Sequence, residues 1–171
     1  MKPILSFFIA LSITMMSSAQ MLKKYPIGES GCAYYGYCSI PFEKILSEDS
    51  SELTVGECVN DGVTYGVICV KLLSPATNLD DAETMVVDYM DFLKKNFDIT
   101  KAVGYGRGNH LGDHEDTRGV TDYWEDKDKN NWKIKAWTDG KIIGVLYGYS
   151  AKELNETKLN VFLDSFRFPG M

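Results

Sequence analysis

Apolar residues recur along the chain at two spacings, and each spacing predicts a different kind of element. Two runs rich in Val, Ile and Tyr, residues 53–60 and 63–73, flank the dipeptide Asp61-Gly62. An Asp-Gly pair between two such runs is a strong signal for a tight hairpin turn. We therefore predict a β-hairpin in this part of the chain.

The next segment changes to helical spacing. Its apolar positions lie three or four residues apart, at Ala82, Met85, Val86, Tyr89, Leu93 and Phe97. Asn78 precedes them, where its side chain can cap a helix, and Asp80 and Asp81 favour the positive end of the helix dipole. The pattern predicts one amphipathic helix that ends near Phe97.

Beyond this helix the chain returns to β-type residues broken by short turns. After a glycine-rich run, strands are predicted at 120–125, 132–138 and 141–149. The turns between them are short, so the strands should form an antiparallel meander. Trp132 and Trp137 differ in parity on one strand and must face opposite sides of the sheet. Either one tryptophan points outward or helices cover the sheet.

A second helix closes the chain. Asn155 can cap it, and its apolar stripe, Leu159, Phe162, Leu163 and Phe166, ends before Pro169. Residues 20–51 show no regular spacing, so an irregular N-terminal segment is expected there. The predicted fold class is α+β: a single domain over residues 52–171 in which two helices pack on an antiparallel sheet, as an α/β/α sandwich.

The first 19 residues are typical of a cleavable signal peptide. Lys2 provides a basic start, an uncharged run extends from Ile4 to Met16, and Ser17 and Ala19 occupy the small positions of a cleavage site. A membrane anchor, the alternative, needs about 20 apolar residues, and this run is shorter. We expect cleavage after Ala19, a secreted or periplasmic protein, and no membrane insertion after signal cleavage.

The charge balance narrows the choice of partners. The chain carries 18 Lys and Arg against 24 Asp and Glu, a formal net charge of −6. Nucleic acids and anionic lipid surfaces repel a protein of this sign. We therefore expect no nucleic acid as a partner, which leaves a protein or a small ligand.

All four cysteines follow the predicted signal: Cys32, Cys38, Cys58 and Cys69. An even number in an exported chain favours disulfides over a metal or redox site, since Cys-x-x-Cys and zinc-knuckle spacings are absent from the sequence. In the predicted hairpin Cys58 faces Tyr65 and Cys69 faces Thr54, so Cys58 and Cys69 lie too far apart to bond each other. Bridges from Cys32 and Cys38 to the hairpin are preferred, and they would staple the N-terminal segment onto the sheet.

The only two histidines, His110 and His114, stand close together with Asp113 between them. This spacing could bind zinc or copper if both rings shared one face. Gly108 and Gly112 favour a loop or a strand, where a shared face is not guaranteed, so a polar loop joining two strands is the preferred interpretation. A metal-binding protein using His110, Asp113 and His114 is the alternative function.

Other motifs suggest no chemistry. Residues 126–130 imitate a calcium loop, but Asn131 and Trp137 stand where the turn glycine and the bidentate glutamate belong, so a hairpin turn is predicted. The glycines of residues 104–108 match no phosphate-binding pattern. The sequence spacing brings no nucleophile, base and orienting group together. No catalytic residue and no cofactor are therefore assigned.

The order of predicted elements, which ends in the segment Val161 to Arg167 (Val-Phe-Leu-Asp-Ser-Phe-Arg), resembles the PsbP-like superfamily over residues 53–168. Those domains are α/β/α sandwiches named for an extrinsic subunit of the photosynthetic oxygen-evolving complex, and exported bacterial members mostly lack a known activity. Residues 32–38 depart from that pattern, and no functional residue is carried over. The resemblance implies a non-enzymatic binding or accessory domain.

Overall fold

The structure, a computed structural model, describes residues 21–47 and 51–171, so the predicted signal peptide lies outside the described residues. The strands are β1 (Lys23–Pro26), β2 (Ala33–Gly36), β3 (Glu43–Leu46), β4 (Glu52–Asn60), β5 (Val63–Lys71), β6 (Ile99–Ala102), β7 (Gly106–Leu111), β8 (His114–Asp126), β9 (Asn131–Thr138) and β10 (Ile142–Ser150). The helices are α1 (Leu79–Asn96) and α2 (Glu156–Leu163).

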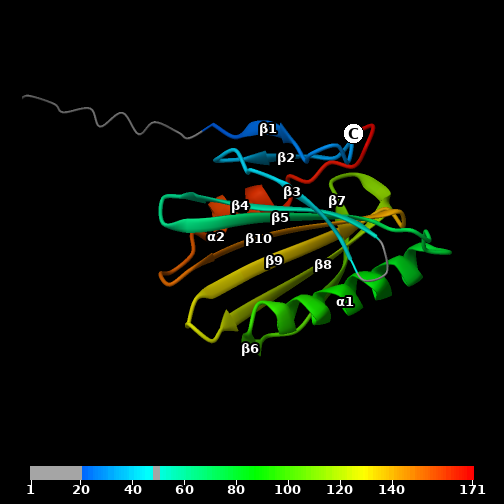
Figure 1. Cartoon of the computed structure of the whole chain (residues 1–171). Coiled ribbons are helices and arrows are strands. Elements are labelled where there is room, and N and C mark those ends of the chain that lie inside the picture. Colours follow the sequence, from blue (N-terminus) through cyan, green and yellow to red (C-terminus); the bar gives the residue numbers. More distant parts are fainter. Residues whose placement is uncertain (1–20, 48–50) are drawn as a thin grey trace, which may run out of the picture.

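One antiparallel sheet organises the described residues. Its strand order is β3-β4-β5-β10-β9-β8-β6, and β7 also pairs with β8. Helix α1 packs on one face, while α2 and the β1–β2 hairpin cover the opposite face (Figure 1). The chain therefore has the predicted α+β fold, with one helix on each face of an antiparallel sheet.

Both faces of the central strands are buried. Along β10 every residue is buried except the half-buried Tyr149. On β9 the two tryptophans face opposite layers: the Trp132 ring stacks on Phe97 at the end of α1, with ring centroids 5.0 Å apart, and Trp137 Nε1 donates to Leu163 O of α2 at 2.8 Å. Of the two alternatives for these tryptophans, the second is therefore correct: both faces of the sheet are covered, and neither tryptophan points into solvent.

The predicted hairpin and first helix are confirmed. Strands β4 and β5 meet at Asp61 and Gly62, whose φ values of 50° and 76° suit a type I′ turn. Helix α1 begins after Asn78, whose side chain accepts a hydrogen bond from Asp81 N at 2.9 Å. Both elements are specified by local residues, namely the turn dipeptide and the capping side chain.

The expectation of an irregular N-terminal segment is wrong. Strands β1 and β2 pair with each other, and β3 extends the main sheet by pairing with β4. Each of these strands has four residues, too few to show a period of two, and their order depends on packing. Tyr34 is fully buried, and its hydroxyl donates to Cys38 O and accepts from Ile40 N.

Two further expectations need correction. The segment around His110 and His114 is a hairpin of β7 and β8, not a polar loop, and shifts in strand register interrupt the alternation that would have shown it. Helix α2 ends at Leu163, so Phe166 is not part of its stripe. Instead the Phe166 ring packs directly on Gly144 of β10.

Neither helix within the described ranges combines the length and hydropathy that a bilayer span demands.

The contact between Gly144 and Phe166 predicts a specific loss of stability. A Cβ added at Gly144 would lie 2.3 Å from the Phe166 ring, so Gly144→Ala should cost ~1–3 kcal/mol of unfolding free energy through overpacking. The matched control is Gly106→Ala, where the nearest atom is Thr121 O at 3.7 Å. Urea unfolding of both variants measures the difference, and equal stabilities would contradict the packing described here.

Candidate functional site

A pocket of about 310 Å³ lies between the N-terminal segment and one end of the main sheet. We call it the thiol pocket, because Cys69 is one of its lining residues. The residues that line it are Gly28, Glu29, Ser30, Phe42, Glu43, Lys44, Glu52, Thr54, Cys69, Lys71 and Ile142.

The floor of the thiol pocket is set by strand register. Lys44, Thr54 and Cys69 are direct cross-strand neighbours on β3, β4 and β5. Glu52 and Lys71 form the next pair, two residues along the same strands. Because cross-strand neighbours, and residues two apart on a strand, lie on one face of a sheet, these five side chains share a surface.

The roof of the pocket is the loop between β1 and β2. Gly28 has a φ of +51° and packs so closely on the floor that an added Cβ would lie 3.0 Å from Thr54 Cγ2. The Ser30 hydroxyl donates to Ile27 O at 2.6 Å and accepts from Cys32 N at 3.1 Å. These local bonds give the loop a defined shape above Thr54.

A disulfide fastens this segment to the sheet. Cys38 bonds Cys58 of β4, with an S–S distance of 2.05 Å. The bridge joins the N-terminal segment to the hairpin, as the sequence favours. The second bridge that the sequence favours, from Cys32 to the hairpin, is not formed: Cys32 and Cys69 carry free thiols in this structure, and each residue is 2% exposed.

The two free thiols touch each other. The hydrogen bond between them raises the pKa of Cys32 and burial adds to the effect, whereas the same bond lowers the pKa of Cys69 against the opposing effect of burial. The Ser30 side chain lies beside both sulfurs. A thiolate at Cys69 is therefore favoured by this hydrogen bond and opposed by burial.

The mouth of the pocket carries charges of both signs. Lys44 Nζ lies 3.0 Å from Glu52 Oε1 and holds the pKa of that carboxyl below its usual range. Within the described part of the chain, Glu29, Glu43 and Lys71 form no ion pair. A ligand entering the pocket thus meets the amino group of Lys71, whose charge also lowers the pKa of the neighbouring Glu52, and the carboxylate of Glu29.

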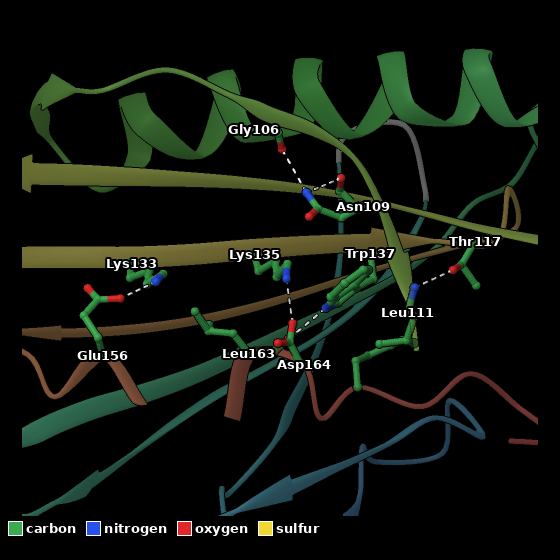
Figure 2. A network of polar contacts seen from close by, with 12 residues as sticks. Gly106, Asn109, Leu111, Thr117, Lys133, Lys135, Trp137, Glu156, Leu163 and Asp164 are labelled. Carbon is green, nitrogen blue, oxygen red and sulfur yellow. Dashed lines mark hydrogen bonds and ion pairs between the residues drawn. The ribbon is translucent and has the colours of Figure 1, made fainter. Parts of the chain in front are cut away.

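The His110–His114 hairpin borders a second hollow, of about 410 Å³, together with Lys135, Asp164 and Arg167. Figure 2 shows Lys135 pointing toward Asp164, with Lys133 and Glu156 paired one step along β9. Lys135 Nζ lies 2.6 Å from Asp164 Oδ1, and Arg167 Nη1 donates to two backbone carbonyls. These charges brace the end of α2 against the sheet.

The histidines themselves meet other partners. His110 Nδ1 lies 3.3 Å from Arg118 Nη1, and His114 Nδ1 lies 3.9 Å from Asp116 Oδ1. Across residues 21–47 and 51–171, no group of three His, Cys, Asp or Glu side chains is arranged to hold a metal ion, and Asp113 completes none. A guanidinium beside one ring opposes a cation there, so this geometry does not favour the metal-binding alternative.

Asp126 opens the predicted hairpin turn and uses its carboxylate within it. Oδ1 accepts from the backbone N–H groups of Asp128 and Asn130, both at 2.9 Å, and Oδ2 accepts from Trp132 Nε1 at 2.8 Å. Although burial raises the pKa of Asp126, these bonds outweigh burial and lower it. The carboxylate therefore stabilises the turn, as expected for a segment that only imitates a calcium loop.

No protein-family model matches the chain, and neither does any curated protein. The resemblance to the PsbP-like superfamily therefore stays a prediction.

Most of the thiol pocket has no signal in the sequence. The one available signal was the predicted hairpin register, in which Cys69 faces Thr54, and the structure confirms it. Ser30 comes to the pocket through the roof loop, and Lys44 comes to it through the pairing of β3 with β4. Neither contact can be predicted from the spacing of nearby residues.

Removal of the Cys38–Cys58 bridge should loosen the roof. The double variant Cys38→Ala, Cys58→Ala should lose ~3 kcal/mol of stability, because the bridge restrains the unfolded chain. Amide hydrogen exchange should accelerate most in residues 27–33, which the bridge holds near the sheet. Exchange that stays as slow as in the parent protein would show that packing alone holds the roof.

Asp126 should contribute to the pH dependence of stability. Because its pKa is lowered by folding, its contribution is complete above the ordinary carboxyl pKa and is lost as pH falls through the lowered value. Asp126→Asn should cost ~1–3 kcal/mol near neutral pH. Urea midpoints of the two proteins should converge as the solution is acidified, and a constant difference would refute the assignment.

Proposed function

We propose that this protein is an exported binding module that takes a small polar ligand, carrying both amino and carboxylate groups, in the thiol pocket. The single observation that carries the proposal is the pocket itself: a hollow of about 310 Å³ whose floor and roof come from separate parts of the chain. Pockets that hold small molecules begin at about this size.

The charges of the lining define the ligand class. Lys71 can attract a carboxylate, while Glu29 can attract an amino group. The hydroxyl groups of Ser30 in the roof and Thr54 in the floor add hydrogen-bonding capacity. A ligand with both charges would satisfy the pocket, whereas a purely apolar molecule would leave these groups without partners.

Export is supported by two independent features. The sequence predicts a signal peptide, and the Cys38–Cys58 disulfide is consistent with an oxidising compartment. The resemblance to exported domains without known activity points the same way. A binding or accessory role in that compartment follows from these features together with the pocket.

Amide chemical shifts test the proposal. Glycylglycine and the sulfur-free amino acids, titrated at up to millimolar concentrations into the labelled protein, should shift the amides of Ser30, Thr54 and Cys69 in a saturable manner. Lys71→Gln should weaken the response to the best of these probes about fivefold, because a partly exposed charge pair is worth up to ~1 kcal/mol.

The matched control is Lys95→Gln, which removes the same charge from the exposed surface of α1. It should leave the affinity unchanged. The proposal would be overturned if no probe shifted the amides of the pocket. It would also be overturned if both variants weakened the response equally.

A further inference from the structure

The thiols of Cys32 and Cys69 form a contact pair in an otherwise well-packed layer. Cys69 lies on β5, and Cys32 directly precedes β2, at the end of the roof loop. Their side chains are hydrogen-bonded to each other, with Ser30 beside both. The other two cysteines are already joined, so this is the free dithiol of the described chain.

The two sulfurs differ in access. Cys69 belongs to the lining of the thiol pocket, whereas Cys32 does not. A molecule that enters the pocket therefore meets Cys69 first, and Cys32 lies within reach of that sulfur. Cys69 is only 2% exposed, so the thiol pocket is the route by which a small molecule approaches its sulfur.

Ionisation follows the same asymmetry. The hydrogen bond between the two thiols lowers the pKa of Cys69, whereas the same bond and burial raise the pKa of Cys32. The thiolate is the nucleophile in disulfide exchange, and a second thiol held next to it can resolve the mixed disulfide. Access and acidity thus select the same residue.

We propose that Cys69 and Cys32 are the attacking and resolving thiols of a disulfide-exchange site, whose substrate is a small disulfide bearing amino and carboxylate groups. The inference rests on the proposed function, because it places the substrate in the same pocket and recognises it through the same charges.

The exchange balances in two steps. The Cys69 thiolate attacks one sulfur of the small disulfide, the S–S bond of that molecule breaks, and one half leaves as a thiolate that takes up a proton. Cys32 then loses its proton, attacks Cys69 Sγ and expels the second half as a thiol. The protein dithiol is oxidised by two electrons to a Cys32–Cys69 disulfide, and the small disulfide is reduced to two thiols.

Oxidised glutathione is the probe for this reaction, since it is a small disulfide with amino and carboxylate groups. The exported protein is first held in reduced glutathione, which should leave Cys38–Cys58 bonded and the other two thiols free. Addition of oxidised glutathione should then join Cys32 to Cys69, with loss of both free thiols. Alkylation followed by peptide mass mapping reports each cysteine.

Two single variants separate the roles. Cys32→Ser should retain one glutathione on Cys69, because the resolving thiol is missing. Cys69→Ser is the matched control and should retain none on Cys32. In the unsubstituted reduced protein, iodoacetamide should label Cys69 before Cys32, which tests the asymmetry even if a variant fails to fold.

Three results would overturn the inference. These are equal glutathione capture by the two variants, free thiols that persist in oxidised glutathione, and a Cys32–Cys69 bridge that reduced glutathione cannot open in the folded protein. Capture by Cys69 without pocket shifts from sulfur-free probes would refute the proposed function alone. Pocket shifts without capture would refute the exchange alone.

Discussion

The structure depends on one constraint: the central strands of the antiparallel sheet must be covered on both faces. Strand β10 is buried along nearly its whole length, and β9 sends Trp132 to one layer and Trp137 to the other. A sheet of this kind is stable only between two apolar layers. Helix α1 supplies one layer, and α2 supplies part of the other.

The thiol pocket lies where the second layer is formed by the N-terminal segment instead of by helix α2. Helix α2 is short, so the N-terminal segment completes the cover with its β1–β2 hairpin (Figure 1). A loop anchored by Cys38–Cys58 packs less continuously than a helix, and the gap lies above Thr54 and Cys69. The same segment thus provides stability, the roof of a pocket and the thiol of Cys32.

The thiol pocket and the hollow beside the His110–His114 hairpin differ in how their charged side chains are paired. Beside the His110–His114 hairpin, Lys135 is paired with Asp164 and the groups hold α2 in place (Figure 2). In the thiol pocket, Lys71 is the cross-strand neighbour of Glu52 and lowers the pKa of that carboxyl, but among the described residues it forms no direct ion pair. Paired charges contribute to structure, whereas charges without a partner are available to a ligand. This contrast is why the binding proposal rests on the pocket with the thiols.

Local sequence determined the elements whose signals lie within a few residues: the Asp61-Gly62 hairpin with Cys69 opposite Thr54, and the helix capped by Asn78. It could not show the four-residue strands before Glu52, which are too short to carry a period, nor β7, whose register is interrupted. The pocket was decided by tertiary structure alone. Ser30 and Lys44 come to Cys69 through contacts between distant segments, and these depend on which surfaces the sheet leaves to be buried.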